Sequence, residues 1–190
     1  MNYIDIQNSL KGSYDIFEID KYLTKIKENG SILDIGCGTG ELLKAGERYH
    51  LKMTGIDISE IMVEFAKEHV PSANVLKMGV YHLEDLEEQF DGIQSSYVFV
   101  HVPREKIENE TRQISQKLNT NGIFYGVFTS ELGGVQQEFL EGDISYYPAS
   151  YTNDEIQDIL VRNGFEVLEI SNGKVVNDAK VGVVIARKVE

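Results

Sequence analysis

A short apolar run that opens directly into glycines constrains this chain more than any other feature. The run SILDI (31–35) is followed by Gly36, Gly38 and Gly40. Apolar side chains then return with a helical period over residues 42–49. Because glycines permit a sharp turn with positive φ, this order predicts a buried strand, a tight loop and a helix.

The same alternation continues to the end of the chain. Residues 52–58 are typical of a second strand, Ser59 of a helix N-cap and Pro71 of a helix end. We expect the buried face of this second helix to be made of Ile61, Met62, Phe65 and Ala66. Further strands are expected at 74–78, 92–100 and 123–129, and further helices at 107–118 and 152–160. An N-terminal helix is expected to bury Ile19, Tyr22, Leu23 and Ile26.

Strands that alternate with helices predict a doubly wound α/β fold with a mostly parallel sheet. The last two β-rich runs, FEVLEI and KVGVVIAR, are separated by SNGKVVND and can form an antiparallel hairpin. We interpret residues 1–190 as one domain with an N-terminal helical segment at 1–30. The long connection at 130–151 has little periodicity, which indicates either a substrate lid or a short element that the pattern does not reveal.

The charge balance limits the partners of the chain. It carries 31 Asp and Glu against 18 Lys and Arg, a formal net charge of −13, so we expect it to bind neither nucleic acid nor an anionic membrane. The single Cys37 and the scattered histidines do not form a metal-binding pattern. Since the sequence has no long apolar run and no signal segment, the expected location is the cytoplasm. The oligomeric state stays open.

Three acidic residues indicate what the glycine loop binds. Asp57 ends the second strand, close to the spacing at which a carboxylate accepts both hydroxyls of a ribose. Glu41 stands in the first turn of a helix, where a carboxylate would repel a pyrophosphate, and this argues against a dinucleotide. Asp34, just before the loop, can instead receive an ammonium or sulfonium charge. The pattern favours a cationic nucleoside.

The motifs ILDIGCGTG (32–40) and GIDIS (55–59) resemble the cofactor motifs of class I S-adenosylmethionine-dependent methyltransferases, and the similarity extends over nearly the whole chain. The resemblance implies a Rossmann-like, seven-stranded sheet and S-adenosyl-L-methionine as the cofactor. It also implies the cofactor contacts: Asp34, Gly36 and Gly38 line the methionine part, with Cys37 and Gly40 in the same loop, while Asp57 holds the ribose and Ile58 contacts adenine.

One departure from this family concerns adenine. Many relatives carry an Asp after the third strand that receives the adenine amino group, but this chain has the stretch MGVYH (78–82) there. Backbone groups of Gly79 and Val80 can take that place, or the side chains of His82, Glu84 or Asp85 can reach in. The NPPY-type turn of nucleic-acid and amide N-methyltransferases is also absent, which disfavours methylation of a base or of glutamine.

The acceptor side of the site is expected to follow the fourth strand. His101 lies there, and an imidazole ordinarily titrates near neutrality, so it is either a general base or a ring bonded to nearby backbone. Tyr146, Tyr147 and Tyr151 either wall a substrate pocket or pack over the edge of the core.

We therefore expect a methyltransferase that acts on a small neutral or cationic acceptor by in-line displacement at the sulfonium methyl. The alternatives are a non-catalytic S-adenosylmethionine-binding module and a nucleotide-dependent oxidoreductase. The identity of the acceptor stays open.

Overall fold

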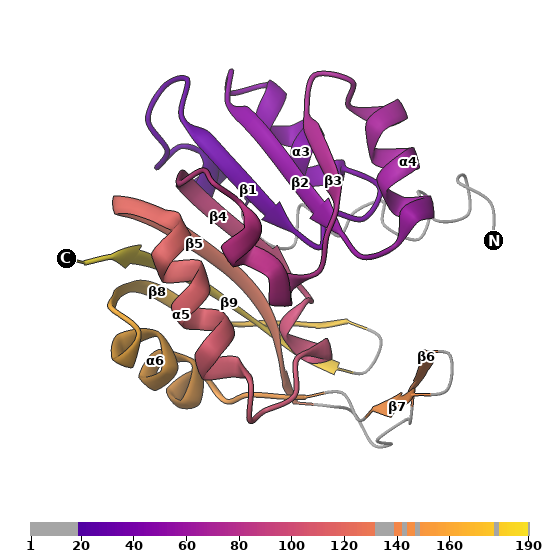
Figure 1. Cartoon of the computed structure of the whole chain (residues 1–190). Helices are drawn as coiled ribbons and strands as arrows, with labels where there is room; N and C mark the ends of the chain where they lie inside the picture. Colours follow the sequence, from indigo (N-terminus) through magenta and orange to yellow (C-terminus); the bar gives the residue numbers. More distant parts are fainter. Residues whose placement is uncertain (1–18, 132–138, 142–143, 147–148, 177–178, 190) are drawn as a thin grey trace.

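The alternating strands and helices assemble into a seven-stranded sheet with helices on both faces (Figure 1). The computed structural model describes residues 19–131, 139–141, 144–146, 149–176 and 179–189. The strands of the sheet are β1 (Ser31–Ile35), β2 (Lys52–Asp57), β3 (Asn74–Lys77), β4 (Phe90–Ser96), β5 (Leu118–Glu131), β8 (Phe165–Val176) and β9 (Ala179–Lys188). The helices are α2 (Ile19–Leu23), α3 (Glu41–Glu47), α4 (Glu60–His69), α5 (Ile107–Lys117) and α6 (Asn153–Arg162), with 3-10 turns η2 (Val80–Asp85) and η3 (Phe99–His101).

The strand order confirms the predicted fold class. It runs β3-β2-β1-β4-β5-β9-β8, and the pairs among β1 to β5 are parallel. β9 pairs antiparallel with both β5 and β8, which confirms the C-terminal hairpin. Most of the stretch expected to separate the hairpin strands belongs to β8 itself, which reaches Val176. The order reverses between β1 and β4, and open α/β sheets place their ligands at such a reversal.

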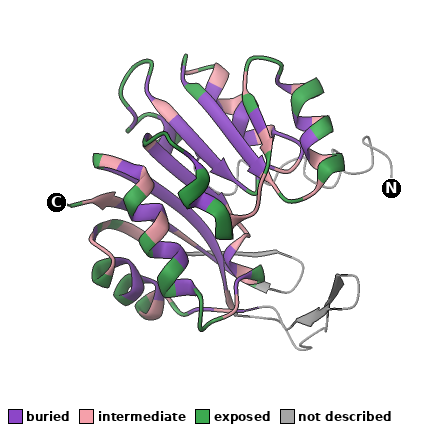
Figure 2. Cartoon of the chain, viewed as in Figure 1, coloured by how far each residue is buried: buried purple, intermediate pink, exposed green. Residues whose placement is uncertain are grey.

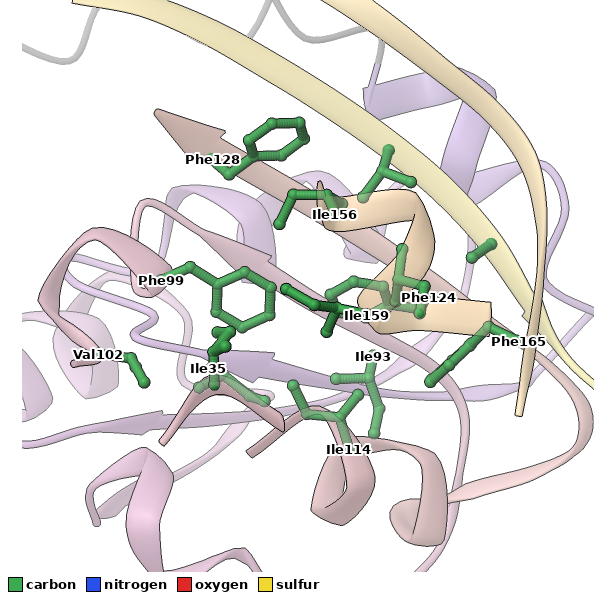
Figure 3. Packing of buried hydrophobic residues seen from close by; sticks show 14 of the residues in the cluster. Ile35, Ile93, Phe99, Val102, Ile114, Phe124, Phe128, Ile156, Ile159 and Phe165 are labelled. Carbon is green, nitrogen blue, oxygen red and sulfur yellow. The ribbon is translucent and has the colours of Figure 1, made fainter. Parts of the chain in front are cut away.

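Each face of the sheet has its own hydrophobic core. Residues from η2, η3, α5 and α6 pack on one face, and residues from α2, α3 and α4 pack on the other. On the first face, the Phe99 and Phe165 rings lie 6.0 and 5.8 Å from the ring of Phe124 (Figure 3). Figure 2 shows the strands buried along most of their length and the outer faces of the helices exposed. All four apolar residues expected to be buried in the N-terminal helix region are buried.

Two local expectations are wrong. The buried face of α4 centres on Val63 and Ala66 and leaves Ile61 61% exposed, because the helix is rotated relative to the face that the apolar pattern predicted. The fourth strand ends at Ser96 and does not reach Val100, because Tyr97 turns the chain with a φ of 62°. The three residues that follow Val98 form η3.

The long connection contains a short element that the sequence pattern did not reveal. β6 (Phe139–Glu141) and β7 (Ile144–Tyr146) pair as a separate antiparallel ribbon, drawn in orange in Figure 1. The segment returns to the domain through two backbone bonds, from Ala149 N to Val100 O at 2.9 Å and from Tyr151 N to Thr129 O at 2.9 Å. Gly133 and Gly134 lie outside the described residues. The lid movement expected of this segment stays a prediction.

Two features are absent from the described part of the chain. None of its helices is long and apolar enough to cross a bilayer. No group of three or more His, Cys, Asp or Glu side chains within it is placed to hold a metal ion.

The packing of α2 on the sheet depends on Gly92 in β4. A Cβ atom added there would lie 2.5 Å from the Tyr22 hydroxyl and 2.7 Å from Ile26 Cδ1. We expect Gly92→Ala to lower the free energy of unfolding by about 1–3 kcal/mol, because the helical region must shift to admit the methyl group. Urea denaturation measures the change. Gly79→Ala is the matched control, since its added Cβ meets no atom closer than 3.9 Å. Equal stability of the two variants would contradict this account of the packing.

Candidate functional site

A cleft of about 530 Å³ opens where the parallel strands β1 to β4 end. It is lined by the last residues of β1, β2 and β4 and by residues of the loops that follow the four strands. Six of the residues predicted from sequence line this cleft: Gly36, Asp57, Ile58, Gly79, Val80 and His101. Asp34, Cys37, Gly38 and Gly40 lie around it and are not among its lining residues. The cleft coincides with the reversal of strand order between β1 and β4.

The glycine loop turns sharply between β1 and α3. Gly36, Gly38 and Gly40 have φ values of 71°, 51° and 84°, a region that residues with a Cβ rarely adopt. The N–H groups of Gly36 and Cys37 both donate to Ile56 O, at 2.8 and 2.9 Å. A Cβ added at Gly38 would meet no atom within 4 Å, so the loop backbone is open to a ligand at that point.

Asp57 joins the glycine loop to the start of α4. Its Oδ2 accepts from Gly38 N at 2.9 Å, and its Oδ1 accepts from Ser59 N at 2.8 Å. Each carboxylate oxygen offers more than one acceptor position, so both remain able to accept a further hydrogen bond. Two backbone donors therefore hold the carboxylate in a fixed orientation at the edge of the cleft.

Asp34 is buried beneath the loop, in the middle of the sheet. It is 1% exposed, and its Oδ2 has no hydrogen-bond partner within the described part of the chain. Burial raises the pKa of this carboxyl to about 8, and the negative charge of Asp57 contributes in the same direction. Gln94, the residue on β4 that is paired with Asp34, offsets part of this increase in the pKa. At neutral pH this carboxyl is therefore mostly protonated, and a positive charge nearby would favour its ionised form.

Cys37 is a packing residue by its environment. Cys37 is 7% exposed. It packs against Gly55, where an added Cβ would lie 2.9 Å from Cys37 Sγ. Burial, followed by the charges of Asp34 and Asp57, raises the pKa of the thiol well above its usual range. A protonated, enclosed thiol is a poor nucleophile.

One end of the cleft is formed by the side chain of Ile58 and the backbone of Gly79. Ile58 is 67% exposed, and a Cβ added at Gly79 would lie 3.9 Å from Ile58 Cδ1, so the two residues lie side by side and form one apolar surface. A flat ligand can therefore approach the backbone at Gly79 and Val80. His82 and Asp85 lie 3.8 Å apart on the exposed side of η2, and neither lines the cleft.

The loop after β4 forms the opposite wall. His101 ends η3 and lines the cleft, with its backbone N–H donating to Val98 O at 2.9 Å. Val98 fills the space above Gly36, where an added Cβ would lie 2.4 Å from Val98 Cγ2. The side of the cleft that carries His101 therefore touches the glycine loop.

Sequence reasoning did not identify Tyr97 and Tyr81 as cleft residues, although both line it. Tyr97 is a bulky residue with a φ of 62°, a strained conformation that usually persists only where the surroundings enforce it. Its backbone N–H donates to Val127 O at 3.0 Å, and burial raises the pKa of its phenol. Periodicity treats Tyr97 as one more strand residue, so no sequence signal marks it.

Of the three tyrosines of the long connection, Tyr151 is the one whose side chain the structure describes, and it does not line the cleft. Tyr151 is 1% exposed and packs in the hydrophobic core, with Arg104 stacked over its ring at 4.7 Å. This placement agrees with the packing alternative for Tyr151. Tyr146 lies in β7, and Tyr147 lies outside the described residues.

Comparisons with known proteins agree with this geometry. A family model described as a methyltransferase domain matches residues 32–122. An uncharacterized methyltransferase of Oceanobacillus iheyensis is 31% identical over 111 residues, which cover 57% of this chain and 52% of that protein. The ubiquinone/menaquinone biosynthesis C-methyltransferase UbiE of Campylobacter jejuni is 32% identical over 100 residues, covering 48% and 43%. The chain thus spans about half the length of the curated relatives that it matches.

Solved structures share the fold over the whole domain. A TehB-like SAM-dependent methyltransferase from Corynebacterium glutamicum matches with a TM-score of 0.74 and 20% identity, covering 98% of this chain and 96% of that one. A SAM-dependent methyltransferase from Clostridium acetobutylicum matches with a TM-score of 0.69 and 15% identity, covering 90% and 89%. At these identities the likeness establishes the architecture.

The buried Asp34 predicts a pH dependence of stability. Its pKa is higher in the folded chain, about 8, than the ordinary value of 3.8, so folding binds a proton between these values. Its contribution therefore favours the folded state at low pH and is lost as the pH rises from about 4 to about 8. The slope attributable to this one group approaches about 1.4 kcal/mol per pH unit.

Asp34→Asn removes this proton-linked contribution while keeping the shape of the side chain. We expect the difference in unfolding free energy, variant minus wild type, to increase between pH 5 and pH 8 in chemical denaturation. A difference that is constant with pH would show that Asp34 is ionised in the folded protein.

Proposed function

We propose that this chain is a member of the class I S-adenosylmethionine-dependent methyltransferase family and that it transfers the methyl group of S-adenosylmethionine to a small-molecule acceptor. One observation carries the proposal. The cleft at the reversal of strand order combines an open glycine loop, the oriented Asp57 carboxylate and the apolar surface of Ile58 and Gly79. A nucleoside with a cationic tail is complementary to all three.

The residues present fit the nucleoside part of this cofactor. The Asp57 carboxylate has acceptor positions left for two ribose hydroxyls, and its orientation is set before binding. The exposed Ile58 and the bare backbone of Gly79 together provide an apolar surface against which one face of a purine can pack. The volume of about 530 Å³ lies within the range of small-molecule sites. Gly79 and Val80 are the backbone candidates for contacting adenine.

The methionine part fits the other end of the cleft. We assign it to the backbone of Gly36 and Gly38, with Cys37 and Gly40 shaping the same loop. Asp34 lies below, and a positive charge above it would favour its ionised form. The cofactor supplies a methyl group already activated on a sulfonium. The residues of the chain are therefore needed mainly to orient the acceptor and to exclude water.

The acceptor side is assigned to the loop after β4. His101 and Tyr97 face the cleft there, on the side opposite Ile58. The formal net charge of −13 favours a neutral or cationic small molecule over a nucleic acid, which this surface would repel. Where the acceptor nucleophile starts protonated, we assign an imidazole nitrogen of His101 to take that proton as the nucleophile attacks.

Two rival functions make different predictions. A dinucleotide-dependent oxidoreductase conflicts with Glu41, whose carboxylate stands in the first turn of α3 where a pyrophosphate would rest. A non-catalytic binding module would bind S-adenosylmethionine without turnover. A screen of small acceptors for production of S-adenosylhomocysteine separates this module from an enzyme, and calorimetry with NAD tests the oxidoreductase.

Gly79→Val is expected to weaken binding of S-adenosylhomocysteine at least about tenfold, because the branched side chain would cover the backbone that the purine is proposed to approach. Isothermal calorimetry measures the dissociation constant, and the melting temperature should change little since no atom crowds this position. Asp85→Ala is the matched control and should leave affinity unchanged. A loss of affinity in the Asp85 variant, with none in the Gly79 variant, would assign adenine recognition to the acid instead.

His101→Gln separates a base from a residue that only positions the acceptor. An amide keeps some hydrogen bonding but cannot accept a proton at neutral pH. For an acceptor whose nucleophile starts protonated, we expect kcat to fall about 10²–10⁴-fold while the affinity for S-adenosylhomocysteine stays within error. The acidic limb of the pH–rate profile should also disappear. Full activity of the variant with such an acceptor would remove the general-base role.

A further inference from the structure

His69 lies outside the cleft, yet its ring contacts the glycine loop. It stands in the last turn of α4, and its Nδ1 lies 3.0 Å from the carbonyl oxygen of Thr39. A carbonyl oxygen can only accept, so Nδ1 must carry the hydrogen and donate it. Thr39 is the residue between Gly38 and Gly40, and its side chain is buried. His69 belongs to none of the sequence motifs described above.

This bond fixes the part of the loop that β2 does not hold. The N–H groups of Gly36 and Cys37 donate to Ile56, and that of Gly38 donates to Asp57, so the first half of the loop is tied to β2 and its end. The bond at Thr39 leads instead to α4. The glycine loop is thus held by two elements. β2, which ends at Asp57, holds its first half, and α4 holds Thr39.

Close packing supports the bond from His69. A Cβ added at Gly40 would lie 3.3 Å from Ala66 Cα and 3.3 Å from Val70 Cγ2, so α4 rests directly on the end of the loop. The His69 side chain is only 19% exposed, which limits competition from water for the Thr39 carbonyl.

Glu41 explains why the ring presents this nitrogen to the loop. Its Oε1 lies 3.8 Å from His69 Nδ1, near enough for its negative charge to favour a hydrogen on that atom. The same carboxylate lies in the first turn of α3, where the N-cap Gly40 offers no side-chain cap. Glu41 therefore favours both the start of α3 and the Nδ1–H form of His69.

We propose that His69 is a positioning residue for the cofactor site: its Nδ1–H holds Thr39 and thereby sets the loop backbone that faces the methionine part of the cofactor. The inference rests on the proposed function. Since His69 does not line the cleft, its removal should affect cofactor affinity and leave the chemical step unchanged. The ring needs only its Nδ1 donor for this task.

Two amide variants isolate that donor. In His69→Asn the amide nitrogen can take the place of Nδ1, whereas in His69→Gln it extends toward the place of Nε2. We expect His69→Gln to raise the calorimetric dissociation constant of S-adenosylhomocysteine about 3- to 10-fold, the equivalent of one hydrogen bond. His69→Asn should stay within about twofold of wild type. Lys67→Ala, an exposed change in the same helical turn, is the control and should match wild type.

Two readouts do not depend on activity. In the ligand-free protein, hydrogen exchange in the loop should be faster in His69→Gln than in His69→Asn. In wild type, ¹⁵N NMR of the imidazole should show the hydrogen on Nδ1, and a neutral ring with its hydrogen on Nε2 would overturn the proposal without any variant. Equal affinities of the two amide variants would overturn it as well. If wild type fails to bind S-adenosylhomocysteine, the proposed function is wrong, and the NMR result still decides the His69–Thr39 bond.

Discussion

The bridge made by Asp57 is the interaction on which the rest of the site depends. One carboxylate holds the glycine loop through Gly38 and the start of α4 through Ser59. The parallel register of β1 and β2, which pairs Ile35 with Ile56, brings the two loops together at one edge of the sheet. The register of the sheet therefore sets the orientation of the Asp57 carboxylate, which is the orientation that the proposed ribose contact requires.

Both faces of the sheet bury polar groups beside their apolar clusters. The face under α5 and α6 carries the larger apolar cluster together with the buried Ser95 and Glu110. The face under α2 carries Asp34, Gln94 and the Tyr22 hydroxyl, all buried and each with at least one polar atom that lacks a partner within the described part of the chain. Buried polar groups without partners reduce stability, and they accumulate where a site needs them. The raised pKa of Asp34 has the same cause, because burial disfavours the charged form of its carboxyl.

The sequence predicted those parts of the molecule whose signals are local. Periodicity located the strands and helices, and the spacing of the glycine loop and Asp57 located the cleft. Periodicity failed at Ile61, because apolar residues lie on more than one side of α4 and the wrong side was predicted to be buried. It also failed at Tyr97, because a left-handed backbone ends the strand there and no glycine marks the position. The bond from His69 to Thr39 joins residues that are 30 positions apart, and no periodicity reveals such a contact.

The strand order also separates the surfaces assigned to the cofactor from those assigned to the acceptor. The loops after β1, β2 and β3 supply the surfaces assigned to the cofactor, and the loop after β4 supplies those assigned to the acceptor. The two halves meet where Val98 packs over Gly36, in the space that a side chain at position 36 would fill. Residues beyond this contact, such as Tyr97 and His101, can therefore change with the acceptor while the cofactor half keeps its shape. A substitution at Val98 itself should alter both halves, because the Val98 side chain belongs to the loop after β4 and packs directly over Gly36.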